Sequence, residues 1–141
     1  SNMDRRAEYL FVSPAVSASK AVRDSVFGAL LVADNRSVEP WASSALSLLN
    51  HRLRQREAIG YIGAGLGVLE EVQQTGDIFF PTGWLRALLS GHTTLEALHE
   101  VEAFWEGQRN YPAMLASKVR QQSDHLYRLN EHKKIQPLPV E

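Results

Sequence analysis

Two histidines and a glutamate near position 95 are the residues best suited to bind a metal ion. Glu96 and His99 lie three residues apart, which places them side by side on a helix, and His92 lies in the turn before it. Di-iron bundles use two Glu-x-x-His motifs and two further glutamates, whereas this chain has one such motif. We therefore expect no metal and no other cofactor. A metal or small-molecule enzyme built around these three residues remains an alternative.

Glycines are concentrated in the middle of the chain. Gly63, Gly65 and Val68 partly match the pattern of a dinucleotide-binding loop, with valine at the position of the third glycine. Such a loop also needs a preceding strand and an acidic residue about 20 positions later, and the pattern provides neither. We therefore interpret Gly60, Gly63 and Gly67 as a small-residue helix face that another helix can approach closely, and we assign them to an interface.

Three arginines, Arg52, Arg54 and Arg56, form a local basic patch that could contact phosphate groups. The formal net charge of the chain is -1, so the whole protein exerts no long-range attraction on nucleic acid. Residues 96–106 contain several glutamates and no lysine or arginine. We expect these opposite charges to pair within the protein or between subunits, with nucleic-acid binding as the alternative.

Aromatic residues near position 80 are the other interface candidates. Phe79 and Phe80 precede Pro81, and two consecutive rings cannot easily face the same core. Exposed aromatic side chains often anchor protein interfaces, so we assign Phe79, Phe80 and Trp84 to one. Nucleophilic catalysis is not indicated, because the chain has neither cysteine nor a Gly-x-Ser-x-Gly motif.

The elements that must position these residues are mainly helices. Apolar residues recur at spacings of three and four over most of the chain, which is typical of amphipathic helices. We expect helices over residues 14–33, 37–53, 57–74, 84–89, 95–106 and 110–130, and the second and third of these could form one bent helix. The clearest start is Thr93, which with Glu96 has the spacing of a capping box.

The pattern predicts an all-α fold, a compact bundle of five to six helices. If the short apolar runs 8–12 and 77–80 pair, a minor two-stranded ribbon is added. We expect a single helical domain over residues 3–131 and a flexible C-terminal tail over 132–141. Residues 1–2, Ser-Asn before Met3, resemble the remnant of an expression tag.

Composition limits the setting in which the protein works. The 141 residues are 44% hydrophobic and 22% charged, which is ordinary for a globular protein. No uncharged run approaches the roughly 20 apolar residues of a membrane helix, so we expect no membrane partner. The absence of cysteine and of a secretory signal pattern favours a cytoplasmic location.

One segment resembles a known family. Trp84-Leu85, followed by Gly91-His92-Thr93-Thr94-Leu95-Glu96-Ala97-Leu98, is similar to a stretch near the C-terminus of Xre/ParS-type bacterial antitoxins. The similarity covers about 15 residues and implies a DNA-binding regulator. The family has proline where Thr94 stands, and its helix-turn-helix is not found upstream.

These observations predict a non-catalytic protein-interaction or regulatory module that acts as a homo-oligomer. The alternatives are an antitoxin-like nucleic-acid-binding regulator that uses the three arginines, and the enzyme built around His92, Glu96 and His99.

Overall fold

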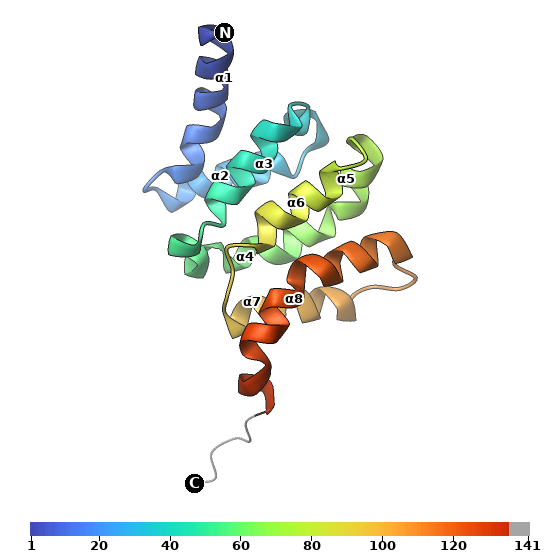
Figure 1. Cartoon of the computed structure of the whole chain (residues 1–141). Coiled ribbons are helices and arrows are strands. Elements are labelled where there is room, and N and C mark those ends of the chain that lie inside the picture. The colour runs from blue at the N-terminus through green and yellow to red at the C-terminus, as the bar shows by residue number, and fades with distance from the viewer. Residues whose placement is uncertain (136–141) are drawn as a thin grey trace.

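The computed structural model describes residues 1–135 and folds them into α-helices and short 3₁₀ helices, with no strand in that part of the chain. The α-helices are α1 (Asn2–Val12), α2 (Lys20–Leu30), α3 (Glu39–Leu49), α4 (Gln55–Gly67), α5 (Leu69–Thr75), α6 (Phe80–Leu89), α7 (Leu95–Glu106) and α8 (Ala113–Ile135). The 3₁₀ helices are η1 (Ser13–Val16), η2 (Ala33–Arg36) and η3 (Arg52–Arg54). The all-α prediction is confirmed, with more and shorter helices than expected. Figure 1 shows α1 projecting at one end of the bundle and the last turns of α8 at the other.

The prediction of a two-stranded ribbon is wrong. Residues 8–12 belong to α1, whose first turn is closed by a capping box between Ser1 and Asp4. Residues 77–80 form a tight turn into α6, in which the Asp77 carboxylate accepts a hydrogen bond of 2.9 Å from the Phe79 amide. The two apolar runs are therefore a helix end and a helix start.

The helix expected over residues 14–33 is divided into η1 and α2. Pro14 does occupy the start of a helical segment, but only one turn follows it. The chain then becomes extended, and Ser19 caps α2 by accepting a hydrogen bond from the Val22 amide. The single bent helix considered for residues 40–74 is likewise divided, by Asn50 into α3 and η3 and by Val68 into α4 and α5.

Helix α6 lies at the centre of the bundle and packs against α3, α4, α5 and α8. Its buried face carries Trp84, Leu85 and Leu88, which are fully enclosed. The Trp84 indole donates a 2.9 Å hydrogen bond to the carbonyl oxygen of Gly65, so its one polar atom is satisfied inside the core. The start of α6 at Phe80 places these residues on one stripe toward the core.

Two buried arginines tie the N-terminal helices to α4 and α5. Arg23 on α2 pairs with Glu57, and its guanidinium also donates to the Ser17 carbonyl oxygen at 2.7 Å. Arg36 in η2 pairs with Glu71 at 2.6 Å and lies over the Trp84 ring at 5.6 Å. Because these guanidinium groups are buried, loss of a carboxylate would leave a desolvated charge without its partner.

The start of α7 is displaced by one residue from its predicted position. Thr94, not Thr93, is the cap, and its hydroxyl accepts a hydrogen bond of 3.1 Å from the Ala97 amide. The amide and the hydroxyl of Thr93 both donate to the Gln55 side-chain oxygen instead. The last helix, α8, continues to Ile135 and so includes the first residues of the predicted tail; the rest of that tail, 136–141, lies outside the described residues.

Candidate functional site

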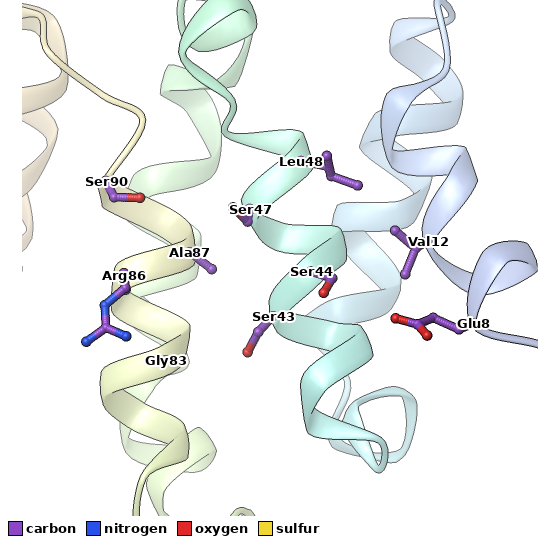
Figure 2. A pocket seen from close by; sticks show the side chains of 10 residues that line it. All are labelled: Glu8, Val12, Ser43, Ser44, Ser47, Leu48, Gly83, Arg86, Ala87 and Ser90. Atoms are coloured by element: carbon purple, nitrogen blue, oxygen red, sulfur yellow. The ribbon is translucent and has the colours of Figure 1, made fainter. Parts of the chain in front are cut away.

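A groove of about 660 Å³ runs along α3, between α1 and α6 (Figure 2). The helices that form it are separated in sequence and are held together by the core beneath them. Residues of all three line it: Glu8, Val12, Ser43, Ser44, Ser47, Leu48, Gly83, Arg86, Ala87 and Ser90.

Small side chains dominate this groove. Ser43 and Ser47 are one turn apart on α3, and Gly83 and Ala87 have the same spacing on α6. Such residues let another backbone approach closely and offer hydroxyl groups to it. No histidine lines the groove to activate a serine as a nucleophile, so the lining is suited to binding and not to acyl transfer.

A second hollow, of about 420 Å³, adjoins the groove at the α1 base. It shares three residues with the groove and is lined by Arg5, Glu8, Tyr9, Val12, Ser13, Val16 and Leu48. Most of this lining is apolar side chain, with one arginine and one glutamate among it. The two hollows lie along one face of α1 where it meets α3.

Helix α1 itself contributes no buried side chain. Met3, Tyr9 and Leu10 are 82%, 68% and 61% exposed. Its main attachment is the half-buried ring of Phe11, which packs on Trp41 with 5.8 Å between ring centroids. An isolated helix of this length is marginal in water, so α1 lacks the packing that normally stabilises such a helix.

Charged groups on α1 also lack partners. Arg5 and Glu8 are exposed, and neither side chain forms an ion pair or hydrogen bond within residues 1–135. They lie one turn apart, beside Tyr9 and Val12 on the same face. Sequence reasoning missed this face, because the run Tyr9–Val12 was equally compatible with a strand.

Of the three aromatic interface candidates, one is exposed and two are buried. Phe79 is 79% exposed, so it is available to a partner. Phe80 and Trp84 are buried, and their assignment to an interface is wrong in this arrangement. The reason is that α6 begins at Phe80, which turns both rings into the core while Phe79 remains outside it.

The glycine candidates lie within helix α4, so the dinucleotide-loop geometry is not formed there. Gly60 and Gly67 face open space, and Gly63 faces the carboxylate of Glu100 on α7. Gly65 is different, because a Cβ at this position would lie 2.7 Å from two methyl carbons of Leu88. The glycine that is needed for close helix packing is therefore the one the sequence analysis did not select.

The metal-site candidates do not converge. His92 is fully buried, whereas Glu96 and His99 lie on the exposed side of α7. Within the described residues no group of three histidine, aspartate or glutamate side chains is placed to hold a metal ion. His92, Glu96 and His99 therefore do not form a set of metal ligands in this structure, and the metal-enzyme alternative has no site there.

His92 instead belongs to a buried polar network that holds the turn between α6 and α7. Its Nε2 is 2.8 Å from the Asn50 side-chain oxygen, and the Asn50 amide donates to the Leu46 carbonyl. Nε2 must therefore carry the proton, which leaves Nδ1 as an acceptor without a partner. The Nε2 of His125 on α8 lies 3.0 Å from the His92 carbonyl oxygen.

Burial makes His92 a weak base. Desolvation of the charged ring lowers its pKa to about 4, and the charge of His125 adds a smaller lowering. The imidazole is therefore neutral at physiological pH and serves the fold. Gly91 beside it has no room for a side chain, since a Cβ would lie 2.1 Å from the Asn50 carbonyl oxygen.

The arginine patch is partly used inside the protein. Arg54 donates to the carbonyl oxygen of Ser17 at 2.6 Å, which ties η3 to the segment between η1 and α2. Arg52 and Arg56 are exposed and form no ion pair within the described residues. Two of the three predicted phosphate contacts thus remain available.

Comparison with protein-family models, with curated proteins and with solved structures finds no match to this chain. Among residues 1–135 there is also no helix with the length and apolar character needed to cross a bilayer. The geometry around α1 is therefore the main support for a function.

Proposed function

We propose that this protein is a non-catalytic interaction module that works as a homo-oligomer. The observation that carries the proposal is the state of α1, an amphipathic helix that buries none of its side chains. Large apolar groups on such a short helix are normally covered, and a second protein surface is the simplest cover. The groove and the hollow beside α1 give that surface its shape.

The lining of both hollows supports binding over catalysis. Small, apolar and hydroxyl side chains dominate, and no acid–base pair within hydrogen-bond reach is found among them. The one strongly perturbed histidine, His92, is enclosed in the core and does not reach either hollow.

The molar mass in solution tests this proposal. Light scattering coupled to size-exclusion chromatography, repeated over a wide range of loading concentrations, should show a mass above the 15.8 kDa of one chain that falls on dilution. A single-chain mass at every concentration would contradict the homo-oligomer.

Nucleic-acid binding is the second candidate function, favoured by the exposed Arg52 and Arg56. Binding through phosphate groups must weaken steeply as salt rises, because it releases counterions from the nucleic acid. A gel shift that is strong at low salt, lost at high salt and reduced by Arg52→Gln with Arg56→Gln would support this function. The absence of any shift at low salt would remove it.

A further inference from the structure

We propose that the face of α1 bearing Arg5, Glu8, Tyr9 and Val12 packs antiparallel against the same face of a second copy of this chain. This inference rests on the proposed function and identifies the surface through which the copies associate. The four residues follow the spacing i, i+3, i+4, i+7, so they form one stripe along the helix. The stripe borders the apolar hollow that continues to Val16 and Leu48.

The exposure of this stripe is the first reason for a partner. Tyr9 and Val16 are largely exposed although both are apolar. Phe11, on an adjacent side of α1, packs on Trp41, and this contact leaves Tyr9 68% exposed. A second helix laid along the stripe would cover Tyr9 and give α1 the packing it lacks.

Charge complementarity is the reason for choosing a second copy. The stripe carries one positive and one negative group, one turn apart, and neither has a partner within the described residues. In a two-fold antiparallel pair, Arg5 of each copy lies opposite Glu8 of the other, so both pairs form at once. A parallel arrangement would instead place like charges opposite each other.

The position of α1 makes this pairing sterically feasible. Figure 1 shows the helix projecting from the body at its α2–α3 end, away from α7 and α8. A partner helix can therefore lie beside the projecting N-terminal part of α1. The small side chain of Ser44 lies on the side of α3 toward Glu8 and Val12, at the base of α1 (Figure 2).

A charge-exchange experiment tests the antiparallel pairing. Arg5→Glu makes the stripe wholly acidic and Glu8→Arg makes it wholly basic, so each variant alone sets like charges against each other. We expect each to weaken self-association about tenfold or more, measured by sedimentation equilibrium at low salt. An equimolar mixture of the two should associate again, because every pair across the interface is then of opposite sign.

Recovery on mixing distinguishes a contact between copies from a role within one helix. A pair formed inside α1 would be lost in both variants, and mixing could not restore it. The matched control is Arg6→Glu, which reverses a neighbouring charge off the stripe and should leave self-association unchanged. If the wild-type protein associates while Arg5→Glu and Glu8→Arg have no effect, or mixing gives no recovery, the pairing is wrong and the proposed function stands. If the wild-type protein is monomeric, both are wrong.

Disulfide trapping provides a second measurement that does not depend on charge. The chain has no cysteine, so any cross-link must come from introduced residues. Under mild oxidation, Arg5→Cys mixed with Glu8→Cys should give a mixed disulfide dimer, because facing helix positions lie within disulfide reach. Arg6→Cys mixed with Glu8→Cys is the control. Equal cross-linking of the control pair would contradict the proposed face.

Discussion

At the scale of single residues, the glycines of α4 show that the same residue type serves opposite purposes on one helix. Gly60 faces open space and only adds backbone entropy to the unfolded chain, whereas Gly65 lets Leu88 of α6 reach the α4 backbone. Glycine in a helix interior is less favourable than alanine by roughly 0.5–1 kcal/mol. The two positions should therefore respond to the same substitution with opposite signs.

We predict that Gly60→Ala raises the free energy of unfolding by about 0.5–1 kcal/mol, because it removes this entropy cost and meets no atom. Gly65→Ala should lower the free energy of unfolding by about 1–3 kcal/mol, because the new methyl group displaces the Leu88 side chain. Urea unfolding followed by circular dichroism measures both. A stabilising Gly65→Ala would show that the α4–α6 contact is looser than the structure describes.

The buried His92 should make stability depend on pH. Its pKa of about 4 lies below the 6.5 of an exposed histidine, so the unfolded chain takes up a proton at a pH where the folded chain does not. The free energy of unfolding is therefore largest above pH 6.5 and falls as the pH drops toward 4, at up to about 1.4 kcal/mol per pH unit from this group. The cause is desolvation of the imidazole in the network with Asn50 and His125.

Replacing the imidazole tests this assignment. We expect His92→Gln to be less stable than the wild-type protein at pH 7, and the difference to shrink on acidification because glutamine does not titrate. The control is His99→Gln on the exposed side of α7, which should keep the wild-type pH dependence. Denaturant midpoints at several pH values provide the comparison. A constant difference between His92→Gln and wild type from pH 7 to pH 4.5 would refute the assignment.

At the scale of elements, α1 packs on α3 and η1, and the ring contact between Phe11 and Trp41 is part of this packing. Removing the ring in Phe11→Ala takes away its packing on Trp41, while the core beneath α3 and α6 is untouched. We expect trypsin to cleave after Arg5 and Arg6 faster in this variant, because α1 unfolds locally more often. The denaturation midpoint of the whole protein should change much less than the cleavage rate.

The matched control for α1 is Leu10→Ala, since Leu10 is the neighbouring apolar residue and is largely exposed. This substitution should leave the cleavage rate close to that of the wild-type protein. If both variants were cleaved at the same increased rate, general helix propensity and not the Phe11 contact would hold α1 in place.

Helices with a long apolar stripe could be predicted from the sequence, and short elements could not. Helices α7 and α8 were predicted close to their observed positions because their stripes span several turns. The run Tyr9–Val12 was ambiguous, since four apolar residues fit a strand as well as a helix end. The cap of α7 was misplaced because Thr93 and Thr94 are equivalent locally. Only Gln55, distant in sequence, draws Thr93 away from the cap position.

The candidate site was less predictable than the fold. The interface prediction relied on apolar residue types, and this failed for Phe80 and Trp84 because burial depends on where α6 begins. The face of α1 could not be selected from the sequence. Whether Arg5 and Glu8 find partners depends on where the fold places all the other charged residues. The His92 network could not be predicted either, because its members come from three separate segments of the chain.

At the scale of the whole molecule, association through α1 must be coupled to folding. A second copy that binds only the folded state stabilises that state by mass action. The apparent free energy of unfolding, and with it the midpoint of denaturation, should therefore rise with protein concentration in the wild-type protein. Above the dissociation constant, the rise is about 1.4 kcal per mole of dimer, or about 0.7 kcal per mole of chain, for each tenfold increase.

The variant Arg5→Glu should shift this concentration dependence to concentrations about tenfold higher or more, because it opposes pairing and alters no buried contact of the bundle. Its midpoint should match that of the wild-type protein at high dilution, where both are single chains. Urea unfolding at two widely separated concentrations, with Arg6→Glu as the control that retains the wild-type behaviour, makes the comparison. A wild-type midpoint that does not move with concentration would mean that the α1 face is not covered by a second copy in solution. The exposed stripe of Arg5, Glu8, Tyr9 and Val12 would then need a different partner to account for it.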